Sequence, residues 1–264
     1  AKWVLPTESD AVLNKDDAPK LDKKASELHG LEFGRDNDDQ QKWTVVDNER
    51  RTIRTTILKS STTDNKGDRA GALLVFKDAR VAIDPSFRGD LVVEVGGTAG
   101  AGGEMTLAKV EPAVTAKIDE VKAVKIGYQN QEIGKLTITE VKAAAAERTD
   151  ENTGIIKLDL PIYRGTSFAK TPTAKVVEGD MTIEKVWMSA DKQSVNIQVT
   201  AESDVASTIE VTDLALTMDR TAPEGELSIA LKGDALIDER TSAKEYFYQA
   251  DTLDTLVIAN VLTS

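Results

Sequence analysis

Few residues in this sequence have the types and spacings that catalysis or metal binding requires. His29 is the only histidine, and cysteine is absent. Thiol nucleophiles, thiolate metal sites and histidine-rich zinc or copper sites are therefore excluded, and any Ser-His-Asp triad would have to use His29. That residue lies in Glu27-Leu-His-Gly30, within a polar stretch that has no nucleophile-elbow pattern. We expect a surface histidine, no catalytic residues and no enzyme activity.

The glycine-rich run Gly96-Gly-Thr-Ala-Gly-Ala-Gly-Gly103 has the composition of a phosphate-binding loop. It contains neither Gly-Lys-Ser/Thr nor the dinucleotide-binding fingerprint, and a strand pattern follows it instead of a helix. A flexible hairpin loop is the better interpretation. No nucleotide cofactor is expected.

One acidic segment, Arg35-Asp-Asn-Asp-Asp39, places oxygen-bearing side chains at alternate positions, as calcium-binding loops do. The glycine and the distant glutamate of the full calcium-loop pattern are absent. The segment is therefore either a calcium site formed by Asp36, Asp38 and Asp39 or a solvated acidic turn. Calcium is the only cofactor that the sequence suggests.

Composition narrows the choice of partners. The chain has 264 residues, of which 45 are acidic and 33 basic, for a formal net charge of −12. This charge disfavours nucleic acids and anionic membrane surfaces, because both are bound through clustered Lys and Arg. No run of 18 apolar residues is present, so we expect no membrane insertion. An acidic chain without cysteine that starts at Ala1 fits a secreted protein after removal of a signal peptide.

The elements that must position any site are strands. Apolar, mostly β-branched residues alternate with polar ones, and Gly, Asp, Asn and Pro separate the runs, which predicts many short strands and an all-β sandwich. Very little helix is expected. The alanine-rich segment 141–148 could form about two helical turns, and residues 21–29 a short helix. The predicted strands are 51–59, 72–77, 80–84, 90–95, 104–110, 123–126, 135–140, 155–160, 181–188, 194–200, 208–212, 214–219, 226–231 and 254–262.

An internal repeat organises these strands. Its offset stays between 135 and 144 residues in the matching pairs, which are Trp43-Thr-Val-Val-Asp47 with Trp187-Met-Ser-Ala-Asp191, Asp78–Asp84 with Asp213–Asp219, Gly89 with Gly225, and Gly97 with Gly233. The repeat predicts two tandem immunoglobulin-like β-sandwich modules, at residues 1–115 and 116–264. We expect Asp84 and Asp219 to cap turns through their side-chain oxygens, and Trp43 and Trp187 to anchor the cores.

The two copies are not equally complete. Strand patterns at 124–126 and 135–140 in the second copy project to positions ahead of residue 1 in the first. We expect the first module to lack its opening strands and to accept a strand from another chain, because an open sheet edge exposes unpaired backbone groups. Two donors are available, although the C-terminal one can instead close its own module. Their apolar residues are Trp3, Val4 and Leu5 at the N-terminus and Leu256, Val257, Ile258 and Val261 at the C-terminus.

Several segments resemble a known group of proteins. They are Val124-Lys-Ile-Gly-Tyr-Gln-Asn-Gln131, Lys135-Leu-Thr-Ile-Thr-Glu140, Gly154-Ile-Ile-Lys-Leu-Asp-Leu-Pro161, Asp219-Arg-Thr-Ala-Pro-Glu-Gly225 and Gly233-Asp-Ala-Leu236. Together they resemble repeats of secreted surface proteins of Gram-positive anaerobes, which often stand beside a copper-amine-oxidase N-terminal-like domain. The resemblance spans about residues 72–240. It implies a surface-layer, sheath or filament component, and it brings no catalytic residues and no oxidase chemistry.

These observations predict an extracellular structural subunit that assembles with copies of itself. The alternative is a secreted adhesin or carbohydrate-binding sandwich that uses loops at one end. Exposed aromatic side chains would discriminate between the two, because sugar rings stack on such platforms.

Overall fold

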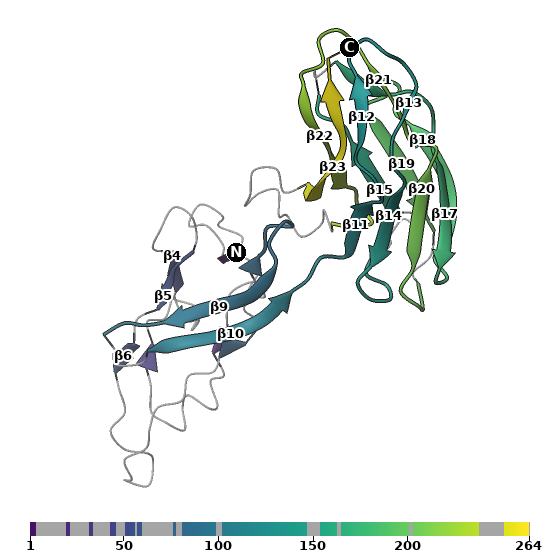
Figure 1. Ribbon diagram of the computed structural model, residues 1–264. Coiled ribbons are helices and arrows are strands. Elements are labelled where there is room, and N and C mark those ends of the chain that lie inside the picture. Colours follow the sequence, from purple (N-terminus) through teal and green to yellow (C-terminus); the bar gives the residue numbers. More distant parts are fainter. Residues whose placement is uncertain are drawn as a thin grey trace. The chain divides into compact units, whose positions relative to one another are not determined.

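The computed structural model (Figure 1) describes the second half of the chain almost continuously and the first half in short segments. The described residues are 1–3, 20–21, 32–33, 43–45, 51–55, 57–59, 76–77, 81–98, 102–146, 154–162, 165–200, 203–237 and 251–263. They form strands and turns, with no helix among them, so the prediction of an all-β protein is confirmed. The chain divides into two compact units, Ala1–Ile83 with Asp90–Ala108 and Asp84–Gly89 with Lys109–Ser264.

The described residues of the first unit form five pairs of strands. Four of them are short and antiparallel: β1 (Lys2–Trp3) with β8 (Val81–Ala82), β2 (Lys20–Leu21) with β7 (Phe76–Lys77), β3 (Glu32–Phe33) with β6 (Ile57–Lys59), and β4 (Trp43–Val45) with β5 (Ile53–Thr55). The fifth pair is longer and joins β9 (Gly89–Val95) to β10 (Gly103–Val110), which run in opposite directions (Figure 1). The glycine-rich run thus connects two strands, and this agrees with its interpretation as a hairpin loop.

The second unit is a β-sandwich. One layer is a six-stranded sheet in the order β12 (Lys122–Lys125), β23 (Thr252–Leu262), β22 (Gly225–Lys232), β15 (Gly154–Asp159), β19 (Ser194–Val199) and β18 (Ile183–Met188). The other is a four-stranded sheet in the order β11 (Val114–Ile118), β14 (Leu136–Glu140), β20 (Thr208–Thr212) and β17 (Thr173–Glu178). A further sheet has the order β13 (Gln131–Glu132), β21 (Ala215–Met218) and β16 (Thr166–Phe168).

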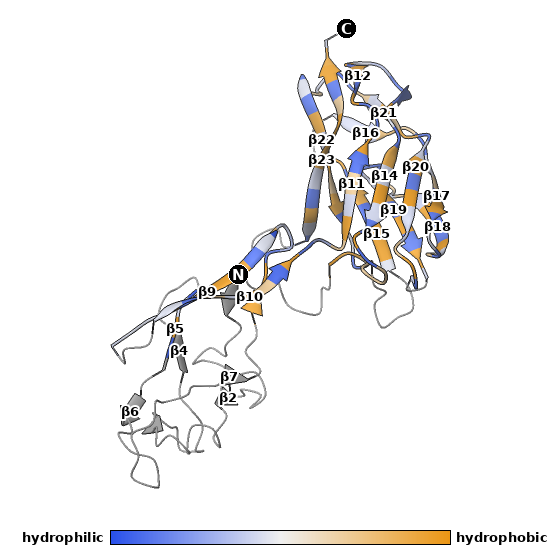
Figure 2. Cartoon of the chain, turned by 60° about the horizontal axis from the view of Figure 1, so that its bottom comes forward, coloured by the Kyte–Doolittle hydropathy of each residue, from blue (hydrophilic) through white to orange (hydrophobic). Residues whose placement is uncertain are grey.

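Alternation along the strands builds the core between the two layers. Leu136 and Ile138 of β14 are buried, as are Ile156 and Leu158 of β15, and the residues between them are only half-buried. In Figure 2, hydrophilic and hydrophobic residues alternate in the same way along β20 and β22. Each such aliphatic side chain contributes roughly 1.5–3 kcal/mol when it is fully buried, so these inward rows hold the layers together.

The internal repeat is visible in two turns with the same hydrogen bonds. Asp84 accepts from the amide and hydroxyl of Ser86, at 2.9 and 2.6 Å, through one carboxylate oxygen. Asp219 accepts in the same way from Thr221, at 2.7 and 2.6 Å. Both predicted turn caps are therefore confirmed. The hydrogen bonds from Thr221, from its hydroxyl first, lower the pKa of Asp219, because they favour the ionised carboxylate.

The helix expected at 141–148 is wrong over the described residues 141–146, which form bends and a turn. Ala144 lies in the left-handed region, at φ +56°, which a right-handed helix excludes. Two side chains hold this conformation. Ser203 Oγ accepts from the Ala144 amide at 2.9 Å, and Glu140 accepts from the Ala146 amide at 3.0 Å. These tertiary hydrogen bonds override the high helix propensity of alanine.

Candidate functional site

The C-terminal strand β23 closes its own module. It pairs antiparallel with β22 along most of its length, and parallel with β12 through Lys122–Lys125 opposite Ala259–Leu262. Of the four residues predicted to join subunits, Ile258 and Val261 are buried in the core, Leu256 is partly buried against it and Val257 is half-buried. Of the two uses left open for this segment, the structure shows closure of the module, because filling its own core satisfies both the apolar side chains and the backbone.

The N-terminal strand β1 adds to a sheet of its own chain. Lys2 pairs with Ala82 and Trp3 with Val81 in antiparallel register. Val4 and Leu5, the other two residues of this predicted donor, lie outside the described residues. Among the described residues, the pairing of β1 with β8 therefore extends over two residues of each strand.

The predicted calcium ligands Asp36, Asp38 and Asp39 lie outside the described residues, as does His29. Within the described ranges, no three His, Cys, Asp or Glu side chains come together in a way that could hold a metal ion. The calcium site therefore stays a prediction.

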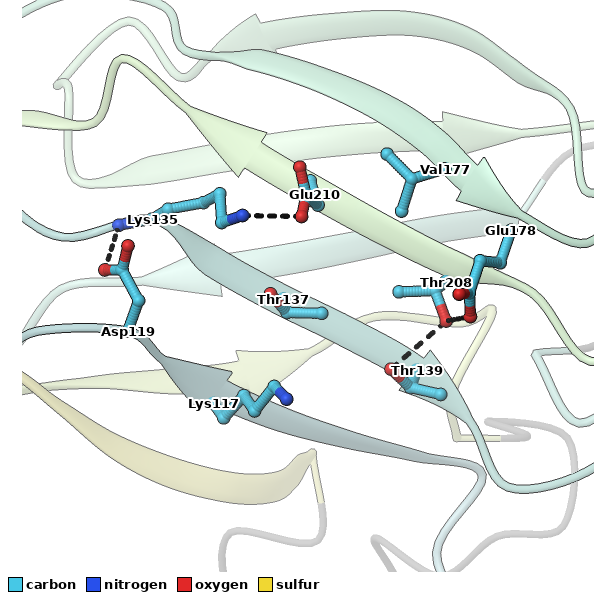
Figure 3. A pocket seen from close by; sticks show the side chains of 9 residues that line it. All are labelled: Lys117, Asp119, Lys135, Thr137, Thr139, Val177, Glu178, Thr208 and Glu210. Atoms are coloured by element: carbon cyan, nitrogen blue, oxygen red, sulfur yellow. Dashed lines mark hydrogen bonds and ion pairs between the residues drawn. The ribbon is translucent and has the colours of Figure 1, made fainter.

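Figure 3 shows a shallow polar hollow on the outer face of the four-stranded sheet, with a volume of about 420 Å³. Its lining consists of Lys117, Asp119, Lys135, Thr137, Thr139, Val177, Glu178, Thr208 and Glu210. Sequence reasoning did not identify this group, because its members come from four strands whose pairing only the fold defines. It contains no aromatic ring on which a sugar could stack and no histidine, cysteine or serine that could act as base or nucleophile.

Two of the five charged side chains in this hollow, Lys135 and Glu210, form an ion pair. Lys135 Nζ lies 2.6 Å from Glu210 Oε1, and this hydrogen bond is the main reason why the pKa of Lys135 is raised above its usual value. Asp119 accepts from the Lys135 backbone amide at 2.7 Å. Such contacts tie neighbouring strands of the sheet together.

A buried carboxylate, Glu140, is a structural clamp. Its side chain is 4% exposed and accepts from the Ala146 amide, the Ser203 hydroxyl and the Ser207 amide, at 3.0, 2.6 and 2.8 Å. A buried charge needs such partners, because desolvation without them is very unfavourable. Glu140 therefore holds the segment after β14 and the one before β20 in place.

Two tryptophans were predicted to be core anchors. Trp187 is half-buried on β18, and the ammonium group of Lys185 lies 5.3 Å from the centre of its ring. For Trp43 the structure defines only the backbone, within β4. Among the described residues, Tyr128 is the one aromatic side chain that ranks with the exposed large apolar residues, at 52%. Among the described side chains, one exposed ring is thus available for stacking on a sugar.

Three large apolar side chains are exposed on the two longest strands of the first unit. On β10, Met105 and Leu107 are 51% and 47% exposed, and Val92 on the neighbouring β9 is 49% exposed. The sequence predicted both strands and gave no signal that β10 would be uncovered on both faces.

Comparison with known proteins gives remote likenesses. The sequence matches no known protein family and no curated protein. Among solved structures it is similar to the 35 kDa C-terminal fragment of the major pilin GBS80 of Streptococcus agalactiae, with 16% identity over 57% of this chain and 56% of that one, at a TM-score of 0.28. It is also similar to the major pilin SpaA of Corynebacterium diphtheriae, with 12% identity over 81% of this chain and 56% of that one, at a TM-score of 0.27.

The chain thus spans about half the length of each of these structures. Both likenesses are too remote to carry a conclusion about function, so the proposal below rests on the residues of this chain. The copper-amine-oxidase N-terminal-like neighbour named in the sequence resemblance is not among these findings.

Proposed function

We propose that this protein is a structural subunit of an extracellular filament, sheath or surface layer, and that it is not an enzyme. The observation that carries the proposal is the way the N-terminal segment joins a sheet. β1 contributes a two-residue pairing to β8. A strand of a neighbouring chain can make the same backbone hydrogen bonds in the same register, and repetition of that exchange produces a polymer.

The rest of the chain supports a structural role. A net charge of −12 keeps subunits apart until specific contacts form, and calcium bound by the acidic N-terminal stretch would relieve that repulsion. The hollow on the second unit offers paired charges and threonines in place of a reactive constellation. A carbohydrate-binding role has a single exposed aromatic ring, that of Tyr128, to support it among the described side chains.

Negative-stain microscopy of the purified chain tests the proposal directly. Filaments or sheets are expected for the full chain, and dispersed particles for a variant that lacks residues 1–13. Circular dichroism must show that the variant keeps its β-structure, since loss of folding would mimic loss of assembly. A full-length protein that stays monomeric in sedimentation at high concentration, with and without calcium, refutes the structural role. A truncated protein that still polymerises refutes β1 as the donor strand.

A further inference from the structure

The outer edge of β10 is an open strand. Every residue of Gly103–Val110 except Val110 is exposed, and among the described strands β10 pairs with β9 alone. Its centre, Met105-Thr-Leu-Ala108, carries no charge. An uncharged, exposed edge strand presents free backbone donors and acceptors together with apolar side chains, which is the pattern that pairs with another chain.

In the second unit the strand that corresponds to β10 is covered, and two edge strands are irregular. There β23 follows β22 and pairs with it, as β10 follows β9, and β12 covers the outer side of β23 in parallel pairing. The edge strands β17 and β18 carry irregularities at 176–178 and 183–185, where the register shifts. Bulges of this kind discourage edge-to-edge pairing. The open edge of β10 therefore contrasts with the covered edge of β23 and with the irregular edge strands β17 and β18.

We propose that β10 pairs antiparallel with β10 of a second copy of this chain, about a two-fold axis through Thr106. Such an axis is perpendicular to the sheet and keeps each face on its own side, so directly opposed residues come from the same face. Centring it on Thr106 places Met105 opposite Leu107 of the partner subunit, and the symmetric contact repeats this pair. Opposed apolar side chains stabilise an antiparallel pair.

The neighbouring register is less favourable. An axis through Leu107 would place Met105 opposite Lys109 of the partner subunit, an apolar side chain against an ammonium group. In its own chain Lys109 lies 3.1 Å from Glu111, and both side chains are largely exposed. Leu107 would meet its own copy in that register, but Met105 would lose its apolar partner. The Thr106-centred register alone matches all four apolar side chains.

A second copy is the partner that best fits this edge, because the pattern is complementary to itself and an assembling subunit meets copies of itself at high local concentration. The contact is isologous, so alone it forms a dimer. It goes beyond the proposed polymer by supplying a lateral contact between subunits, and it does not depend on exchange of β1. Such a contact is what joins filaments into a sheath or a layer.

Single cysteines test the register, because the native chain has none and every disulfide dimer must then come from the introduced residue. Thr106→Cys should give a disulfide dimer on mild oxidation, since opposed Cβ atoms lie about 4.5–5.5 Å apart in such a pair, near the range that a disulfide spans. Val92→Cys is the matched control: it is similarly exposed, but about three strand spacings, roughly 14 Å, separate the two β9 strands across the axis.

At the same low protein concentration we expect Thr106→Cys to form dimer at least about tenfold faster than Val92→Cys, because pairing raises the local thiol concentration. Leu107→Cys tests the alternative register, because an axis through Leu107 would place the two introduced cysteines opposite each other. Faster dimerisation of Leu107→Cys than of Thr106→Cys overturns the proposed register. Equal, slow rates in all three variants overturn the β10 contact altogether.

The double substitution Met105→Lys, Leu107→Lys provides an independent measurement. It places like charges opposite each other across the proposed axis, so it should shift sedimentation toward the monomer and abolish the Thr106→Cys cross-link. Its far-UV spectrum should match the wild type, because both side chains are exposed. Unchanged dimer in sedimentation contradicts the inference. Microscopy separates the two proposals: if the Thr106→Cys variant, with Met105 and Leu107 intact, forms filaments but no disulfide dimer on oxidation, the proposed function stands and only this contact is refuted.

Discussion

Removal of the Glu140 side chain should destabilise the second unit strongly. Glu140→Ala deletes the acceptor for three donors, the amides of Ala146 and Ser207 and the hydroxyl of Ser203. A buried donor left without a partner costs about 1–3 kcal/mol. Because the loops can relax and admit water, we expect about 3–5 kcal/mol in total, as for other broken buried charge networks.

Urea unfolding followed by circular dichroism measures this loss, and calorimetry should show a melting temperature lower by roughly 10 °C for a unit of this size. Glu184→Ala is the control, since this glutamate is exposed on β18 and its removal should change stability by no more than about 0.5 kcal/mol. The stability of Glu140→Gln should fall between the stabilities of Glu140→Ala and Glu184→Ala. Glutamine keeps the shape, but its amide group can point a donor at another donor.

Removal of a donor to Glu140 should also lower the stability of the second unit. Ser203→Ala removes the hydroxyl that donates to Glu140 and also the acceptor for the Ala144 amide. The hydrogen bond to the charged group alone should be worth about 1.5–3 kcal/mol, so the total loss should be at least that large. In a double-mutant cycle, the losses of stability from Glu140→Ala and Ser203→Ala should be clearly non-additive, because both remove the hydrogen bond between these two residues. If Glu140→Ala is no less stable than Glu184→Ala, the carboxylate does not anchor these loops and the reasoning fails.

Three further results are expected. Gly233→Ala should destabilise the second unit by more than Gly225→Ala. Both glycines have φ near +110°, but only at Gly233 would an added Cβ clash with a backbone oxygen, that of Ile155. Equal losses of stability in urea titrations would contradict this. Asp219→Asn should make stability fall less steeply with decreasing pH below about pH 4. A carboxylate whose folded pKa is lowered stabilises the fold above its unfolded pKa of about 3.9 and loses that contribution as the pH falls through the folded value. An unchanged slope would show that this turn is not linked to acid unfolding. Deletion of 253–264 should prevent the second unit from folding, as seen by circular dichroism and proteolysis, and a stable truncated unit would show that β23 is dispensable.

Chelation tests the predicted calcium site. If Asp36, Asp38 and Asp39 bind calcium, EDTA should lower the melting temperature or disperse assemblies. The triple substitution to asparagine should abolish that response. A response that is the same in the triple variant would assign calcium binding to other residues.

Local patterns in the sequence determined the strands and the turn caps. The alternation that buries Leu136 and Ile138 is visible in the residues, because successive side chains of a strand point to opposite faces. The equivalence of Asp84 and Asp219 followed from the repeat, and their hydrogen bonds reach only two residues along the chain. Interactions this local leave a signature in a short window of sequence.

Long-range pairing was decided by the tertiary structure. Strands β11, β16 and β17 were missed, although β11 alternates apolar and polar residues, and strands distant in the sequence pair with them. The parallel pairing of β12 with β23 joins segments more than 130 residues apart. It decides that the C-terminal strand closes its own module. Burial of a carboxylate at Glu140 likewise depends on donors up to 67 residues away. No local pattern encodes such contacts, because they form only when the two layers pack.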